Sequence, residues 1–408
     1  MRTGRLQGKG LRIPILVIVL ITLLMVTACA PVLTTTVEKK VVEIVNIAPL
    51  TGPSASSEQI VLQALQDYVN YFNEEKGIPE TTINLLWADV GFNVPMFISA
   101  YSKFVDRGVL IFVSDESTSL AALKSRFERD EVPVISGCST GPLVYPPGWI
   151  YCPCPTFGEA STAVIDYFME TWEEERPPRF AYICPDTVFG QTAAEEGSKY
   201  ANSIGLDVLP MEIVPYVVID ASPQLLRLKD READLVYIQN ILPGLGPVLN
   251  DAERLGLIGD IQFGGLEFSL GETLISMTGS ACEGYLTPRA TPWFDETEIP
   301  GIKAIKDTQV RYHGKVRNEP EYIAGWLSAA IACESIKSAI EEVGYENIDR
   351  LDIKRALDSM TDFDVDGIVK ISFTAEQRRG SRMVATYQII EGQIVRVSDW
   401  REVPILVP

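Results

Sequence analysis

Segments with the hydrophobic spacing of strands alternate along the chain with segments that have the spacing of helices. The first series predicts strands at 41–48, 82–88, 109–113 and 132–136, separated by helices at 58–75, 94–107 and 120–129. After a proline-rich stretch at 142–155, a second series predicts strands at 180–184, 207–214, 235–238 and 261–263, with helices at 192–204, 223–233 and 247–255. This order is typical of parallel sheets with crossover helices, so it predicts an α/β protein with two doubly wound parallel-sheet lobes joined by a hinge.

The last third of the chain breaks this alternation. Two long helices, predicted at 302–312 and 322–343, have few strands around them, so we expect them to return to the first lobe. A strand at 367–373 and a hairpin at 385–397 follow and are expected at a sheet edge. The predicted first lobe is therefore 41–155 plus about 290–345, and the second is 156–289 plus about 346–408.

The N-terminus predicts export from the cytoplasm. Basic residues precede an apolar run at 13–26 that contains no acidic residue and leads into Val26-Thr-Ala-Cys29. Small residues before a cysteine resemble the lipobox of bacterial lipoproteins, which implies a signal peptide at 1–28, lipid attachment at Cys29 and a tether at 29–40. The alternative is an uncleaved membrane anchor that carries a free cysteine. Both interpretations place the rest of the chain outside the cytoplasm, and no later stretch approaches the about 18–20 uninterrupted apolar residues of a membrane span.

Charge and composition exclude several classes of function. The 408 residues include 55 acidic and 35 basic ones, and removal of residues 1–28 takes away four basic residues and no acidic one, so the net charge changes from −20 to −24. Such a field repels phosphate backbones and anionic lipid surfaces, which excludes nucleic acid as a partner and leaves acyl chains to hold the protein at the membrane. Because His313 is the only histidine, sites with several histidine ligands are excluded, and we predict no metal and no cofactor.

Four segments carry a resemblance to a known family. They are Ala48–Ser54 (Ala-Pro-Leu-Thr-Gly-Pro-Ser), Val132–Pro142, Pro185–Gly190 (Pro-Asp-Thr-Val-Phe-Gly) and Val236–Gly246. The chain from about 41 to 400 resembles the type I periplasmic binding proteins of the branched-chain amino acid (Leu/Ile/Val) class, which deliver ligands to ABC importers. This resemblance agrees with the predicted sheets, because open parallel sheets bind ligands beyond the carboxyl ends of their strands.

The resemblance also implies a set of ligand-binding residues. The ligand carboxylate is expected at Ser117, the backbone of Ser139 and Thr140, the ligand ammonium at Glu267, and an aromatic wall at Phe189. Ser117 lies where a strand ends and a helix begins, a position that favours an anion. The alternatives are a helix cap for Ser117, turn residues for Ser139 and Thr140, and a solvated loop acid for Glu267.

This sequence departs from the family pattern near the expected ligand. Ile241-Leu242 replaces an aromatic residue that helps to hold the ammonium, and Ser56-Ser57 stands where some relatives have an aromatic residue. Asp115 and Glu116 also add negative charge beside Ser117. A dianionic ligand is therefore disfavoured, whereas a zwitterionic amino acid or a neutral amide or urea-like molecule is easier to accommodate.

One match to an enzyme motif has to be considered. Gly137–Gly141 fits G-x-S-x-G around Ser139, and His313 follows in the order of a serine hydrolase. A nucleophile elbow continues into a helix, however, and prolines at 142, 146 and 147 oppose one here. We therefore predict that the protein is not an enzyme, with a serine hydrolase as a remote alternative.

The cysteines after Cys29 leave a disulfide open. A bridge from Cys138 to Cys152 or Cys154 is one possibility in an oxidising compartment, and buried free thiols are the other.

Taken together, these features predict a monomeric, lipid-anchored, extracytoplasmic solute-binding protein. It is expected to capture a small molecule, an amino acid of the branched-chain type or a relative, in the cleft between its lobes and to deliver it to an ABC permease. A ligand-sensing lipoprotein and a binder of a neutral amide or urea-like compound are the alternatives.

Overall fold

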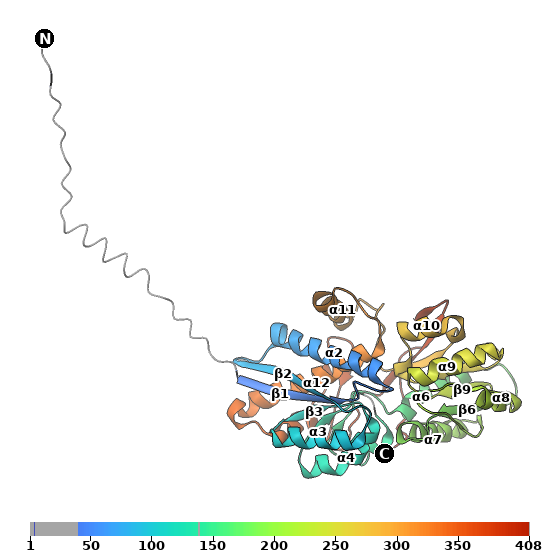
Figure 1. Cartoon of the computed structure of the whole chain (residues 1–408), viewed down its shortest axis with the longest axis horizontal. Helices are drawn as coiled ribbons and strands as arrows, with labels where there is room; N and C mark the ends of the chain where they lie inside the picture. Colours follow the sequence, from blue (N-terminus) through green and yellow to red (C-terminus); the bar gives the residue numbers. More distant parts are fainter. Residues whose placement is uncertain (1–3, 5–39, 138, 408) are drawn as a thin grey trace. The chain divides into compact units, whose positions relative to one another are not determined.

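The computed structural model describes residue 4 and residues 40–137 and 139–407. The predicted signal peptide, apart from Gly4, the lipid-attachment residue Cys29, the tether up to residue 39 and Cys138 lie outside the described residues. The chain from Lys40 onward forms one unit with two large sheets and one small two-stranded sheet, and Figure 1 shows the helices of the two large sheets as two groups.

The first lobe is built on a parallel sheet in the order β2-β1-β3-β4-β5. Its strands are β1 (Lys40–Ala48), β2 (Thr81–Asp89), β3 (Ile111–Val113), β4 (Val134–Ile135) and β5 (Ile150–Tyr151). The connecting helices are α2 (Ala55–Tyr71), α3 (Val94–Asp106), α4 (Ser117–Arg129) and the short α5 (Gly141–Val144). Most of β1 is buried, as its run of β-branched residues predicts for a central strand covered on both faces.

The second lobe has a larger, mixed sheet in the order β15-β14-β11-β10-β9-β6-β7, with β8 beside β6 and β16 beside β14. Its strands are β6 (Arg179–Cys184), β7 (Asp207–Val208), β8 (Glu212–Ile213), β9 (Leu235–Ile238), β10 (Gln262–Gly265), β11 (Leu286–Arg289), β14 (Met383–Ile390), β15 (Gln393–Arg396) and β16 (Arg401–Glu402). Its helices are α6 (Phe157–Thr171), α7 (Val188–Ser203), α8 (Ser222–Asp230), α9 (Leu242–Arg254) and α10 (Glu272–Thr278). The strands from β6 to β11 are parallel, and the tail hairpin β14-β15 adds antiparallel strands at one edge. Two parallel-sheet lobes confirm the predicted fold class.

The two long helices α11 (Pro300–His313) and α12 (Pro320–Val343) return to the first lobe and pack against α2, as expected. Trp326 of α12 is fully buried and meets the Tyr68 ring edge-on, with ring centroids 4.8 Å apart. Within the described residues, α12 is the one helix whose length and hydropathy match a membrane span, and 78% of that window is buried in the protein. The apolar character of α12 is thus explained by its place in the core.

The chain re-enters the second lobe later than the expected residue 346. Arg350, at the start of α13 (Arg350–Asp358), donates hydrogen bonds to the carbonyls of Val105, Val109 and Asp130 in the first lobe. The small sheet of β12 (Phe363–Asp364) and β13 (Lys370–Ile371) follows α13, and the chain returns to the sheet of the second lobe only at β14. The predicted boundary is corrected accordingly, because the guanidinium of Arg350 binds α13 to first-lobe carbonyls.

The cysteines in the described part of the chain are buried free thiols: Cys152, Cys154, Cys184, Cys282 and Cys333. Of the two possibilities left open by the sequence, the structure therefore has free thiols at Cys152 and Cys154.

Candidate functional site

A cleft lies between the lobes, at the carboxyl ends of the parallel strands. Its first-lobe lining comes from the start of α2, the segments after β2 and β3, and the first turn of α12. The facing lining comes from the first turns of α6 and α7 and the segments after β8, β9 and β10. The empty space in the cleft, its open mouth included, is about 750 Å³.

The second-lobe wall of the cleft is apolar. The Phe157 ring meets the Phe189 ring edge-on at 5.3 Å between centroids, and Phe189 stacks on Tyr216 at 5.9 Å. The Tyr216 hydroxyl lies 3.1 Å from the Thr187 hydroxyl, which fixes the outer end of this ring pair. The complete wall consists of Phe157, Phe189, Tyr216, Ile241, Leu242, Leu266 and Phe268. Such a surface binds the apolar body of a ligand.

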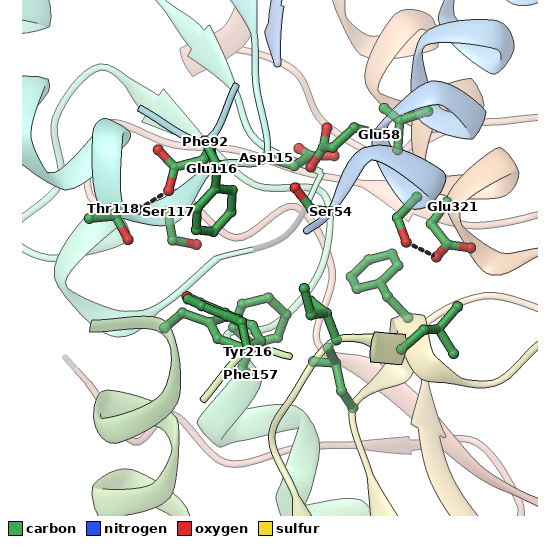
Figure 2. Close-up of a pocket in the computed structure, with 17 residues that line it drawn as sticks. Ser54, Glu58, Phe92, Asp115, Glu116, Ser117, Thr118, Phe157, Tyr216 and Glu321 are labelled. Atoms are coloured by element: carbon green, nitrogen blue, oxygen red, sulfur yellow. Dashed lines mark hydrogen bonds between the residues drawn. The ribbon is translucent and has the colours of Figure 1, made fainter. Parts of the chain in front are cut away.

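Phe92 closes one end of the cleft from the first lobe. It follows Gly91 after β2 and has a φ of 59°, in the left-handed region that a bulky residue rarely adopts. Its ring meets Tyr216 of the second lobe edge-on, with centroids 5.2 Å apart. This pair is a direct contact between the lobes across the mouth of the site (Figure 2).

The first-lobe wall of the cleft is acidic. Figure 2 shows carboxylates from three elements of the lobe around the cleft: Glu58 on α2, Asp115 and Glu116 between β3 and α4, and Glu321 on α12. Among the described lining residues none is basic. Seryl and threonyl hydroxyls of Ser54, Ser57, Ser117 and Thr118 complete this wall.

Burial raises the pKa values of three carboxyl groups on this acidic wall. Burial raises the pKa of Glu58 well above its ordinary value, and the charges of Asp115, Glu116 and Glu321 raise it further. Burial raises the pKa of Asp115 to about 6, against a hydrogen bond from the Gly137 N–H that favours the charged form. Burial likewise raises the pKa of Glu321 to about 7. Ionising Glu58 and Glu321 is therefore costly near neutral pH.

Glu116 caps helix α4 with its own side chain. Its carboxylate accepts hydrogen bonds from the backbone N–H groups of Thr118 at 3.1 Å and Ser119 at 2.8 Å. These are the donors that a helix N-terminus offers to an anion. The place at which the sequence predicts a ligand carboxylate thus holds a carboxylate of the protein itself.

The residues predicted from sequence fall into two groups. Ser117 and Phe189 line the cleft, whereas Ser139, Thr140 and Glu267 are buried outside its lining. The Ser139 hydroxyl donates to the Thr140 carbonyl, and the Glu267 carboxylate accepts the N–H of Ala290 at 2.9 Å. Burial raises the pKa of Glu267, although the positive charge of Arg289 opposes the shift.

Comparison with known proteins shows which family has this architecture. Residues 41–393 match the sequence model of the periplasmic binding protein family. The chain belongs to that family.

Three relatives illustrate the likeness. A Leu/Ile/Val-binding protein homolog from Brucella melitensis biotype 1 is 25% identical over 305 residues, which is 73% of this chain and 78% of the relative. The solved structure of a branched-chain amino acid ABC transporter protein from Thermus thermophilus with bound valine superposes with a TM-score of 0.82 at 25% identity, covering 89% of this chain and 97% of that one. A fatty acid ABC transporter substrate-binding protein from Thermomonospora curvata has the same fold, with a TM-score of 0.79 at 18% identity over 90% of this chain and 96% of that one.

Members of the family bind small molecules for ABC importers and are not enzymes, which confirms that prediction for this binding protein. The geometry of the hydrolase-like motif agrees. The ring of His313 lies 2.7 Å from the carboxylate of Asp67, on α2, to which the Tyr322 hydroxyl also donates. Ser139 is 1% exposed and bonded to a backbone carbonyl, so no triad of Ser139 and His313 is assembled.

Proposed function

We propose that this periplasmic binding protein is a lipid-anchored carrier that captures a small nitrogen-containing solute in the interlobe cleft and delivers it to an ABC permease. The observation that carries the proposal is the contrast between the walls of one cleft, acidic on the first lobe and apolar on the second. A ligand with a nitrogen head and an apolar body, of the branched-chain amino acid class or related to it, complements both walls. The Leu/Ile/Val-binding relatives support this class of ligand.

Individual residues of the two walls have distinct roles in ligand binding. The rings of Phe189 and Tyr216 pack against its apolar body, and the hydroxyl of Ser117 hydrogen-bonds its polar head. The acidic groups of Glu58 and Glu321 take the ammonium, the part that the family resemblance gave to Glu267. Glu267 instead holds the segment after β10 through Ala290, so that its neighbours Leu266 and Phe268 present their side chains to the ligand.

Ligand binding favours a closed arrangement of the lobes. A molecule that contacts Glu58 on one lobe and Phe189 on the other gains both contacts only when the cleft is closed. The edge-to-face pair of Phe92 and Tyr216 adds a contact that opening would break. The permease can then distinguish the loaded carrier by its shape.

A thermal-shift screen tests the proposal. The purified full-length protein is heated with a panel of aliphatic and aromatic amino acids, their amides, the corresponding amines, and ureas. A ligand present at 100 times its Kd stabilises the folded protein by about 2.7 kcal/mol, which shifts the melting temperature measurably. Stabilisation by a nitrogen-containing member of the panel supports the function, and a panel without any stabilising compound contradicts it.

A further inference from the structure

We infer that the cleft binds an organic cation with an apolar body and no carboxylate, such as an amine or an amino-acid amide, through the carboxylates of Glu58 and Glu321. The inference rests on the proposed function and specifies its ligand. It departs from the zwitterionic amino acid that the family resemblance favours.

The first step of the argument is the balance of charge. Four carboxylates face the cleft from the first lobe, and no lysine, arginine or histidine is found among the described lining residues. The charge of Arg289 acts on Glu267 and Glu321. Arg289 does not line the cleft, however, because it is fully buried behind the wall, where its guanidinium stacks over Trp293. A ligand carboxylate entering this cleft would meet the charge of Glu116 with no cation among the described lining residues to offset it.

The second step is a set of buried polar atoms that lack partners. Glu58 is 8% exposed, Glu321 3% and Ser54 7%, and all three line the cleft. Glu58 Oε2, Glu321 Oε2 and Ser54 Oγ accept or donate no hydrogen bond within the part of the chain that the structure describes. Buried polar atoms of native proteins are nearly always paired, so these three mark the place where a ligand supplies donors. Two of the three atoms are carboxylate oxygens, which only accept once the group is ionised.

The third step concerns the helix terminus that would otherwise attract an anion. Thr118 and Ser119 already donate their backbone N–H groups to Glu116, which supplies both the cap and the negative charge. A ligand carboxylate would have to displace a side chain that is tethered to the same turn.

The fourth step separates an organic cation from a metal ion. In residues 40–137 and 139–407, no three histidine, cysteine or acidic side chains are grouped closely enough to hold a metal. The opposite wall, with the stacked rings of Phe189 and Tyr216, offers apolar surface where a hydrated metal ion needs oxygen ligands. A nitrogen head with an attached apolar body fits both surfaces.

The titration of the wall agrees with this ligand. Because burial raises the pKa of Glu58 well above its ordinary value and that of Glu321 to about 7, these two groups retain protons near neutral pH that a bound cation replaces. Binding of the cation therefore releases protons.

Two matched series of probes test the inference by calorimetric titration of the full-length protein at pH 7. The aliphatic series is isoamylamine, L-leucinamide, L-leucine and 4-methylpentanoate, and the aromatic series is phenethylamine, L-phenylalaninamide, L-phenylalanine and 3-phenylpropanoate. In at least one series we expect the amine and the amide to bind, the zwitterion to bind at least about tenfold more weakly than the amide, and the acid not to bind. The inference is overturned if the zwitterion binds as tightly as the amide, or if no amine or amide binds.

Variants assign the binding to the named carboxylates. Glu58→Gln keeps the side-chain shape and removes the charge, so it should weaken binding of the tightest cation about tenfold or more, and Glu321→Gln provides an independent second variant. Glu128→Gln on the exposed face of α4 makes the same change in net charge away from the cleft and should leave the affinity unchanged. Equal affinity in both cleft variants and in the control overturns the assignment.

A reversal experiment addresses the capped helix. Glu116→Ala frees the N–H groups of Thr118 and Ser119 and should raise the affinity for L-leucine or L-phenylalanine relative to its amide by about tenfold. An unchanged ratio contradicts the role given to Glu116. Tight binding of a zwitterion by the unmodified protein would defeat the inference while leaving the proposed carrier function intact, whereas only a panel without any ligand defeats the function.

Discussion

The Glu116 carboxylate accepts the backbone N–H of Ser119 at 2.8 Å, within the first turn of α4. The sequence predicts this turn as the anion site of the cleft, because a serine there follows a strand and opens a helix. With Glu116 in that place, the same turn becomes part of an acidic wall. One residue before the helix thus changes the charge of ligand that the cleft accepts.

The aromatic pair on the second lobe should contribute to affinity through packing. Phe189→Ala removes a ring that stacks on Tyr216 and faces the ligand, so we expect the Kd of the best ligand to rise about tenfold or more. Tyr216→Phe is the matched control, since it keeps the ring and removes only the hydroxyl contact with Thr187. Calorimetry that finds both variants equal to the unmodified protein would show that the ligand does not touch this wall.

The acidic wall should make the empty protein less stable as the pH rises. The folded-state pKa of Glu321 is about 7, above its ordinary value of 4.5, so between these values the folded state binds more protons than the unfolded state. Stability contributed by this proton is present below about pH 4.5 and is lost as the pH rises through 7. After burial, the charge of Glu319, just before α12, raises the pKa of Glu321 and the charge of Arg289 of β11 lowers it. Glu58 on α2 in turn has its pKa raised by the charges of Asp115, Glu116 and Glu321.

Glu321→Gln isolates this effect. The amide keeps an acceptor for the Ser57 hydroxyl, which lies 2.8 Å from Glu321 Oε1, and removes the titration. Above pH 7 the variant should be more stable than the unmodified protein by on the order of 2 kcal/mol, and the difference should vanish near pH 4.5. Urea unfolding at a series of pH values measures it. A constant difference across the series would mean that Glu321 does not titrate in this range.

Glu267 should act on the protein rather than on the ligand. Its carboxylate is 7% exposed, accepts the Ala290 N–H and feels the charge of Arg289. Glu267→Gln leaves Arg289 without its countercharge, so we expect a lower melting temperature and an unchanged Kd once the protein is folded. A large loss of affinity at unchanged stability would return the ammonium to Glu267.

The lipid anchor is tested at Cys29. Cys29→Ser removes the thiol that carries the acyl chains, and the acidic mature chain offers no basic patch to replace them. We expect the variant to remain uncleaved or to be released, as fractionation and immunoblotting of cells would show. A cleaved variant retained at the membrane would contradict the lipoprotein assignment.

The sequence predicts elements whose periodicity is clear and misses those that are buried on all sides. The strand at 41–48 and the helix at 322–343 are found where expected, within one or two residues. Helix α6 is buried over its first nine residues, polar Glu159, Ser161 and Thr162 included, so polar residues do not mark a solvent face there. A local signal for it is the capping box, in which Thr156 and Glu159 bond each other's backbone N–H groups.

The site was harder to predict than the fold, for a related reason. Glu58 lies at helical spacing from Val61 and Leu65 on the buried face of α2, and an acid on such a face was a visible signal of a polar site. Glu267 is the opposite case, an acid that looks like a site residue in the sequence but does not line the cleft. Its neighbours Leu266 and Phe268 face the cleft, whereas the carboxylate between them does not. In a turn, a shift of one residue decides whether a side chain faces the cleft or the protein interior. Hydrophobic periodicity does not determine which of the two it faces.

The most direct test of the account is a crystal structure of the protein with its tightest-binding compound. The account predicts that the nitrogen of this compound lies within about 3 Å of a carboxylate oxygen of Glu58 or Glu321, with its apolar body against Phe189 and the N–H groups of α4 still bonded to Glu116. A bound carboxylate at the N-terminus of α4, with Glu116 displaced, would contradict it.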